Sequence, residues 1–334
     1  MVSDQKFILT NVDRYRVTEA MVEGLRVILT YRGELYSTAY LQGISGAAFN
    51  ISGICPCAPT CSSFTGPQDL AKQLGYQVDY VPLFGDGVDL TRDVPLLVAR
   101  IKDEIRAAHP VLVWHAFTYA EWDVVCGFNE EISTFYGRGS YFGLDEYAAA
   151  DEGRTATCLD ICPALGAIFI GDKTSQLDVQ AAEIDSLKKA LDHAYSSKNK
   201  DKLGGSEWVL LEGLACYDRW IDAFMNSTFI PNMSDRYCFN VYRSTHHAAA
   251  DYLRELSVKY PQAAGSLEGA AVHFEMEAAS LHTCTEMLFP HGELPQSSSS
   301  DQNITAVNWL TTTRNHYARG MDGIMQALED LKGG

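Results

Sequence analysis

A change of pattern near residue 177 constrains the fold more than any other feature of this chain. Before it, helical stretches alternate with short apolar runs; after it, apolar residues recur only at three- to four-residue spacing, the pattern of amphipathic helices. In the first part, helical stretches precede strand candidates at 111–115, 122–128, 133–136 and 167–170. Helices followed by a run of strands indicate an α+β fold with an antiparallel sheet, and argue against βαβ winding.

We therefore expect an α+β domain at residues 1–174 and an all-α helical bundle at residues 175–334. The bundle helices are expected near 179–195, 207–225, 240–256, 263–288 and 306–331. In the first domain we expect helices at 18–33, 35–42, 68–74 and 94–108, with a strand at 77–81. A chain of 334 residues with 46% hydrophobic content can bury two separate cores.

The charge of the chain excludes several kinds of partner. A net charge of -17 repels phosphate backbones and anionic membrane surfaces, so neither nucleic acid nor a membrane is an expected partner. The N-terminus lacks the charged and apolar regions of a signal peptide, and no apolar run is long enough to span a bilayer. We expect a cytoplasmic protein, and an apolar helix face left outside the bundle would allow a homodimer.

The cysteines indicate a reducing compartment. Their number, nine, is odd, and a chain of this size does not need disulfides to fold. Cys55, Cys57 and Cys61 are clustered, but a zinc site built on such a knuckle would need a second one, which the sequence lacks. We expect no metal and no cofactor.

Several short motifs in the first domain resemble a known family. They lie at residues 40–49, 74–80, 110–114, 121–129 and 139–142. These stretches resemble the N-terminal domain of the butirosin biosynthesis protein H family and the C39 peptidases, and residues 213–220 resemble the helical domain that follows it in two-domain bacterial members. The resemblance covers most of the chain and implies a papain-like fold for residues 1–174.

The resemblance also implies where a catalytic pair would lie, and this chain lacks that pair. In such proteins a histidine opens the strand that here begins near residue 121, and it takes the proton from a cysteine at the start of the first long helix. Glu121 occupies the histidine position and Ala20 the cysteine position. Ala20 has no nucleophilic atom, and a carboxylate beside a thiol would raise the thiol pKa instead of activating it.

The remaining chemistry at that position is acidic. Side chains alternate along a strand, so Glu121 and Asp123 are expected to face one cleft. Two close carboxylates push one pKa upward and supply an acid and a base, which makes both residues catalytic candidates. The alternative is structural: one carboxylate caps a helix N-terminus and the other meets Arg26 or solvent.

Further candidates complete this site. Cys61 is the remaining nucleophile candidate because its loop is expected to pass the cleft, and His115 is the candidate base; the alternatives are an inert buried thiol and a structural histidine. Candidate substrate-binding residues are Ser140, Tyr141, Trp122 and Asn50.

The helical half carries its own pattern. His273 and Glu277 are four residues apart and share a helix face, a spacing that suits a pair of metal ligands. The favoured alternative is a buried Glu277 that a tyrosine or arginine satisfies across the bundle.

Together these observations predict a papain-like protein without the Cys-His pair, a pseudoenzyme in the peptidase sense. It would bind or process a small molecule or peptide in secondary metabolism. Two alternatives stay open: an acyl or amide transferase or hydrolase that uses Glu121, Asp123, Cys61 and His115, and a catalytically dead regulatory binding protein.

Overall fold

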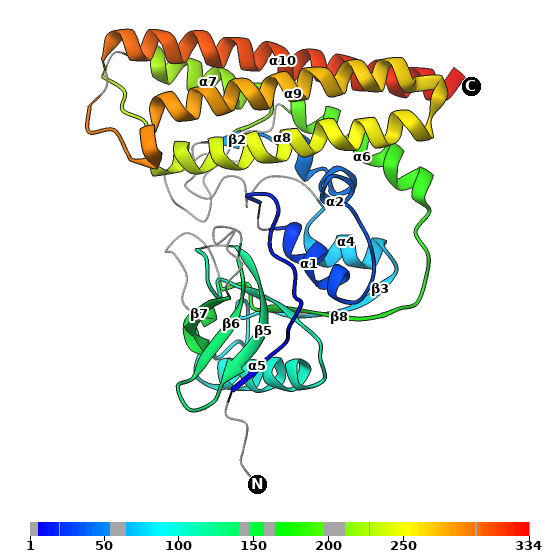
Figure 1. Cartoon of the computed structure of the whole chain (residues 1–334), viewed down its shortest axis with the longest axis vertical. Coiled ribbons are helices and arrows are strands. Elements are labelled where there is room, and N and C mark those ends of the chain that lie inside the picture. The colour runs from blue at the N-terminus through cyan, green and yellow to red at the C-terminus, as the bar shows by residue number, and fades with distance from the viewer. Residues whose placement is uncertain are drawn as a thin grey trace. The chain divides into compact units, whose positions relative to one another are not determined.

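The computed structural model describes residues 6–19, 21–53, 65–119, 121–139, 147–156, 164–196, 211–226, 228–297 and 299–333. The chain forms two compact units (Figure 1). Unit 1 comprises residues 1–38 and 66–177, and unit 2 comprises residues 39–65 and 178–334. The expected division at 174/175 assigned residues 39–65 to the first domain, whereas the described part of this stretch, residues 39–53 and 65, belongs to unit 2.

Unit 1 is built on an antiparallel sheet. Its strands are β1 (Lys6–Ile8), β3 (Tyr76–Val81), β4 (Val111–Trp114), β5 (Trp122–Asn129), β6 (Thr134–Arg138), β7 (Ala148–Asp151) and β8 (Ala167–Lys173). The strand order is β3-β8-β4-β5-β6-β7, and β1 pairs with the end of β5. Every pairing in this sheet is antiparallel, which confirms the expected α+β architecture.

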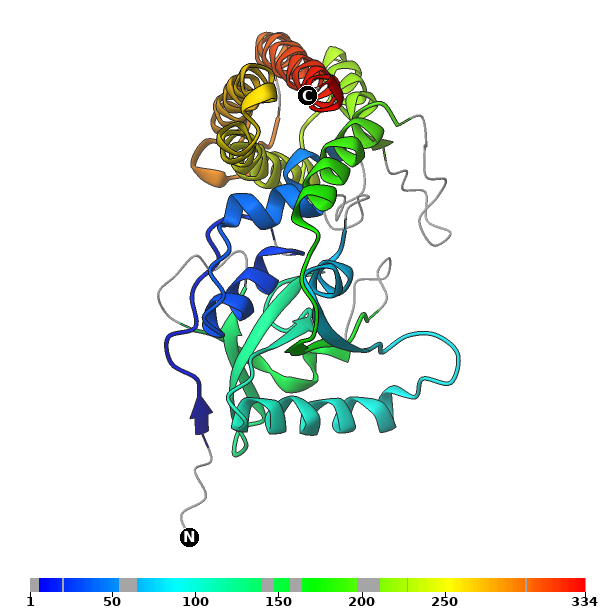
Figure 2. The ribbon, with the colours of Figure 1, turned by 90° about the vertical axis from the view of Figure 1, so that its right-hand side faces the viewer.

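Helices pack on both faces of this sheet. They are α1 (Glu23–Tyr31), α4 (Pro67–Gln73) and α5 (Leu90–Arg106). Figures 1 and 2 show the sheet between α1 and α5. All of β4 is buried, as expected for a strand that is covered on both faces. Pro67 occupies the first turn of α4, and the Asp89 side chain accepts the Thr91 amide hydrogen at 3.0 Å to cap α5.

Unit 2 is mostly helical. Its helices are α2 (Thr38–Ser45), α6 (Val179–Ala194), α7 (Leu214–Met225), α8 (Met233–Lys259), α9 (Ala264–Leu288) and α10 (Ser300–Gly333). The long helices α8, α9 and α10 run side by side (Figure 1). Leu267, Phe274 and Leu281, each seven residues apart on α9, are fully buried, so one stripe of this helix forms the bundle core.

A short segment, residues 49–52, is enclosed by these helices. Tyr317 donates a hydrogen bond to the Phe49 carbonyl at 2.9 Å, and His246 Nε2 lies 2.8 Å from the Asn50 carbonyl. His193 Nε2 lies 2.9 Å from the Ile51 carbonyl, and Tyr242 donates to the Ser52 carbonyl at 2.7 Å. Tyrosine and histidine side chains thus satisfy buried backbone groups that a core of aliphatic residues would leave unpaired.

The segment continues into a two-stranded antiparallel pairing inside unit 2. β2 (Ser52–Gly53) pairs with β9 (Leu211–Glu212).

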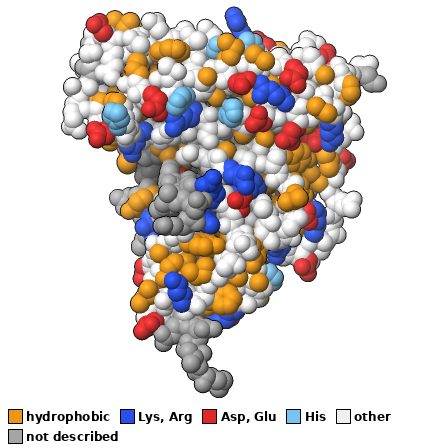
Figure 3. All heavy atoms as spheres, viewed as in Figure 1, with side chains coloured by type: hydrophobic (Ala, Val, Ile, Leu, Met, Phe, Trp, Pro, Cys, Tyr) orange, Lys and Arg blue, Asp and Glu red, His pale blue; other side chains and the backbone are white. Residues whose placement is uncertain are grey.

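No described helix of the chain is long and apolar enough to cross a membrane. On the face drawn in Figure 3, acidic and basic side chains are interspersed, although the chain is acidic overall.

Candidate functional site

The first turn of α1 packs directly against the starts of β4 and β5. A Cβ atom on Gly24 would lie 2.6 Å from Leu112 Cδ2 and 2.6 Å from Tyr15 Oη. Tyr15 in turn donates a hydrogen bond to the Trp122 carbonyl at 2.7 Å. Glycine at position 24 therefore permits the close approach, and the beginning of the helix lies next to the beginning of the strand, as the sequence analysis required.

Four buried carboxylates act electrostatically on the Tyr15 hydroxyl. They belong to Glu19, Glu23, Glu121 and Asp123, each at most 6% exposed. Burial and the negative charges of these groups hold the pKa of Tyr15 well above its ordinary value. Tyr15 therefore keeps its proton and acts as a hydrogen-bond donor. We call Tyr15 and these four carboxylates the acidic cluster.

The helical side of the acidic cluster is structural. The Glu19 carboxylate accepts the amide hydrogens of Met21 at 2.6 Å and Val22 at 3.1 Å, and so caps the start of α1. Glu23 Oε1 accepts from Arg26 Nε at 2.6 Å, while Glu23 Oε2 has no hydrogen-bond partner among the described atoms. Burial, opposed by Arg26, raises the pKa of Glu23 from 4.5 to about 7.

Asp123 fastens the loop between β4 and β5. Its Oδ2 accepts the amide hydrogens of Phe117 at 2.6 Å and Thr118 at 2.9 Å, and its Oδ1 accepts the Thr118 hydroxyl at 2.6 Å. Burial raises the pKa of Asp123 from 3.8 to about 6, against the lowering effect of these hydrogen bonds. Both carboxylate oxygens of Asp123 thus accept hydrogen bonds from residues of this loop.

Glu121 and His115 close the same loop through the backbone. The His115 amide donates to the Glu121 carbonyl at 2.7 Å, and His115 adopts a positive φ of 59°. The His115 ring lies 5.2 Å from the Tyr119 ring and is 3% exposed. Burial and ring packing of this kind are typical of a structural histidine.

The other predicted site residues are distributed more widely. Trp122 is 3% exposed, and its ring packs 5.4 Å from Trp114 and 6.3 Å from Tyr80. Asn50 belongs to unit 2, where its carbonyl meets His246. The predicted residues Ala20, Cys61, Ser140 and Tyr141 lie outside the described residues.

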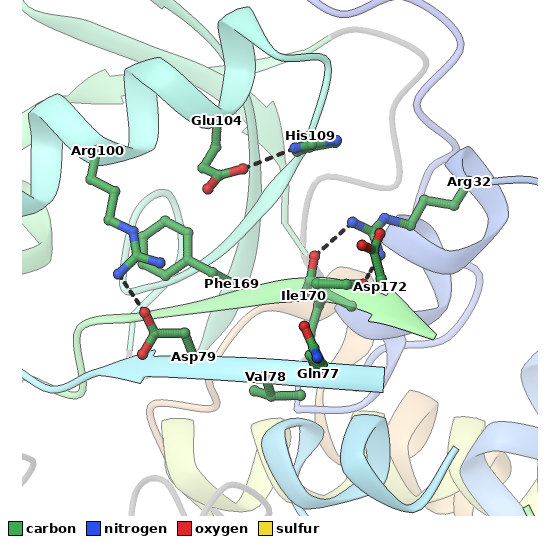
Figure 4. Close-up of a pocket in the computed structure, with 11 residues that line it drawn as sticks. Arg32, Gln77, Val78, Asp79, Arg100, Glu104, His109, Phe169, Ile170 and Asp172 are labelled. Carbon is green, nitrogen blue, oxygen red and sulfur yellow. Dashed lines mark hydrogen bonds and ion pairs between the residues drawn. The ribbon is translucent and has the colours of Figure 1, made fainter. Parts of the chain in front are cut away.

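A pocket lies elsewhere in unit 1, between α5 and the strands β3 and β8 (Figure 4). Its volume is about 460 Å³. The lining residues are Arg32, Gln77, Val78, Asp79, Arg100, Glu104, His109, Phe169, Ile170, Gly171 and Asp172. This volume is within the usual range for small-ligand sites.

Most polar groups of the pocket are already paired. Arg100 forms an ion pair with Asp79 at 2.7 Å, and its guanidinium carbon lies 3.7 Å from the centre of the Phe169 ring. His109 Nδ1 lies 2.9 Å from Glu104 Oε2. Both pairs are drawn in Figure 4.

Three groups in the pocket remain available to a ligand. Arg32 donates to the carbonyls of Gly171 at 2.5 Å and Ile170 at 2.6 Å, and within the described residues it has no carboxylate within ion-pair distance. The side chains of Gln77 and Asp172 form no hydrogen bond or ion pair with any described residue. The pocket therefore offers an exposed carboxylate that forms no ion pair with a described residue, an amide and a guanidinium.

The bundle contains a second buried acidic group. Tyr217 donates a hydrogen bond to Glu277 Oε1, and His246 Nδ1 lies 2.9 Å from the same oxygen. Both Glu277 and His246 are fully buried. Tyr217, across the bundle, therefore supplies a donor to Glu277 Oε1, as the favoured alternative of the sequence analysis predicts, whereas Glu277 Oε2 has no hydrogen-bond partner among the described atoms.

Sequence reasoning missed Tyr15, Glu19 and Glu23 as members of the acidic cluster. A signal was present, because Glu19 and Glu23 are four residues apart and Arg26 follows Glu23 by three, so these charges share one helix face. Tyr15 precedes the helix and carries no such pattern.

In the part of the chain that the structure describes, no three His, Cys, Asp or Glu side chains are arranged to hold a metal ion.

The architecture defines an α+β unit with an antiparallel sheet and a mostly helical second unit. Comparison of the chain with models of known protein families and with curated proteins gives no match.

Proposed function

We propose that unit 1 is a papain-like, C39-like domain that binds a small molecule or peptide and does not act as a thiol peptidase. The observation that carries this proposal is the hydrogen bonding of Asp123. Asp123, two residues after the position where C39-like proteins have a histidine, accepts hydrogen bonds from a loop. Glu19 caps the first helix, and Glu23 accepts a hydrogen bond from Arg26 within it.

Acyl or amide transfer by relocated groups has less support. A proton acceptor must be within hydrogen-bond reach of the group that it activates. Both oxygens of Asp123 already accept hydrogen bonds from Phe117 and Thr118. The sheet cysteine, Cys126, is no substitute nucleophile, because burial raises its pKa to about 12.

The pocket between α5, β3 and β8 is the proposed binding site. Its carboxylate Asp172, which forms no ion pair with a described residue, can bind a cationic group, while Gln77 and Arg32 can hold polar groups beside it. We therefore assign to the pocket a ligand that carries a free ammonium group, either a small amine or the N-terminus of a short peptide.

The proposal is tested by calorimetric titration of the full chain with primary amines, amino acids and short peptides. Each compound is paired with its N-acetylated form, which lacks the ammonium charge. We expect the amines to bind and the acetylated forms to bind at least about tenfold more weakly, a difference of about 1.4 kcal/mol.

A matched pair of variants locates the site. Asp172→Asn removes the negative charge that would bind the ammonium group and is expected to weaken binding about tenfold. Asp86→Asn removes an exposed carboxylate that does not line the pocket, and it is expected to leave binding unchanged. Equal affinity of Asp172→Asn and the parent chain, or cleavage of the peptides, would overturn the proposal.

A further inference from the structure

A pair of histidines lies between two packed helices of unit 2. His273 on α9 and His316 on α10 approach each other with their Nδ1 atoms 3.3 Å apart. Their ring centres are 5.5 Å apart, with an interplanar angle of 35°. Both side chains are half-buried, so solvent reaches the pair while the helices fix it.

This separation matches the geometry of zinc coordination. Zn–N bonds of about 2.0–2.1 Å at the tetrahedral angle put two ligand nitrogens about 3.3–3.4 Å apart. An octahedral ion with similar bonds would need about 2.8–3.0 Å between adjacent nitrogens. The observed distance also exceeds the usual length of about 2.9–3.0 Å for a protein N–H hydrogen bond.

We infer that His273 and His316 bind a zinc ion through their Nδ1 atoms, with water completing the tetrahedral coordination. The ion would lie between the two Nδ1 atoms, each imidazole keeping its proton on Nε2, and would join α9 to α10. Imidazole nitrogen is a common zinc ligand, and an acidic chain of net charge -17 concentrates cations at its surface.

Two charged groups, Arg319 and Glu277, act on this pair of histidines. Burial lowers the pKa of both histidines, with Arg319 as a further lowering charge, so each imidazole is neutral at pH 7 and has a lone pair to offer. Glu277, on the α9 turn after His273, acts on His316 in the opposite direction. Its negative charge partly offsets the positive charge of Arg319.

The test is titration of the metal-free full chain with zinc alone, followed by calorimetry. We expect the double variant His273→Gln/His316→Gln to bind one equivalent of zinc fewer than the parent chain. His247→Gln is the matched control, because His247 is an exposed histidine on α8. It is expected to bind zinc like the parent.

A separate experiment is needed for the cysteines, since Cys55, Cys57 and Cys61 could also bind zinc. Zinc held by thiolates would persist in the double variant, and cobalt in that place would show thiolate charge-transfer absorption in the near ultraviolet. A histidine-bound ion shows neither property. Equal zinc stoichiometry in the parent and the double variant would overturn the inference.

A pH series on the parent chain keeps the inference testable if the double variant fails to fold. Below the pKa values of both imidazoles, each bound ion displaces two protons, so the affinity falls up to about 100-fold per pH unit. The affinity is expected to be constant between pH 7 and 8.5. A continued rise there would indicate thiol ligands and would contradict the inference.

Discussion

Tyr317 and Phe49 are 268 residues apart in the sequence, yet the Tyr317 hydroxyl donates a hydrogen bond to the Phe49 carbonyl at 2.9 Å. Both residues are fully buried in unit 2. The bond is one of several through which aromatic and histidine side chains satisfy the backbone of residues 49–52. The stability of the bundle should therefore depend on this early segment.

Removal of the Tyr317 hydroxyl tests that dependence. Tyr317→Phe would leave the buried Phe49 carbonyl without a donor, and we expect a loss of about 1–3 kcal/mol in the free energy of unfolding of unit 2. The measurement is urea denaturation. Tyr195→Phe is the control: Tyr195 is 51% exposed and its hydroxyl lies 3.3 Å from Asp322, so its loss should cost less than about 0.5 kcal/mol.

The close approach at Gly24 gives a second prediction. Gly24→Ala would place a methyl group 2.6 Å from Leu112 Cδ2, and we expect this overpacking to cost about 1–3 kcal/mol of stability in unit 1. Gly269→Ala, on α9, is the matched substitution, because nothing lies within 4 Å of the added carbon. It should be neutral or stabilising by up to about 1 kcal/mol, as alanine favours helix. Thermal unfolding that ranks the two variants the other way would contradict the packing of α1.

The raised pKa of Glu23 predicts how stability changes with pH. Its folded pKa of about 7 lies above its ordinary value of 4.5, so between these values the folded state holds a proton that the unfolded state has released. The contribution of this group to stability is complete below pH 4.5 and declines as the pH rises to about 7. Hydrogen exchange of the β4 and β5 amides, corrected for intrinsic rates, measures that decline.

Two variants isolate the role of Glu23. Glu23→Gln should flatten the decline between pH 4.5 and 7, whereas Glu131→Gln, a change of an exposed carboxylate, should leave it unchanged. Asp123 adds a similar decline up to about pH 6, so some dependence should remain in both variants. A decline of equal size in the parent and in Glu23→Gln would show that Glu23 does not titrate in this window.

Thiol labelling provides a further prediction. Cys126, Cys216, Cys238 and Cys284 are buried free thiols. Burial raises the pKa of Cys126 and of Cys284 to about 12, and that of Cys216 well above its ordinary value. Mass spectrometry after iodoacetamide treatment of the native chain at pH 7.5 should find all four unmodified. Fast modification of Cys126 would show that the sheet opens readily.

The elements with strong periodicity were predictable from the sequence. The helix expected at 179–195 is α6 (Val179–Ala194), and the helix expected at 263–288 is α9 (Ala264–Leu288). By contrast, β7 (Ala148–Asp151) consists mainly of alanine, which has low strand propensity, and only its pairing with β6 makes it a strand. Such pairing is a tertiary effect that local sequence does not contain.

Helix ends were less predictable than helix centres. The helix expected at 18–33 is α1 (Glu23–Tyr31), because Glu19 uses its carboxylate to cap the helix instead of entering it. The helix expected at 306–331 is α10 (Ser300–Gly333), which starts earlier than its apolar pattern.

The candidate site was predictable only in its position. The sequence placed Glu121 and Asp123 next to the first helix, and the structure shows Asp123 bonded to Phe117 and Thr118 within a loop. Those hydrogen bonds depend on the backbone path after His115, where φ is positive at 59°. A periodic pattern of residues carries no information about that path.

The enclosure of residues 49–52 has a consequence for synthesis in the cell. The ribosome adds about 5–20 residues per second, so the 268 residues between Phe49 and Tyr317 take roughly 15 to 50 seconds to appear. Until the end of that interval the enclosure of residues 49–52 is incomplete, because His193, Tyr242, His246 and Tyr317 are added one after another. For the same reason, a fragment that begins at residue 178 would lack an internal part of its own core.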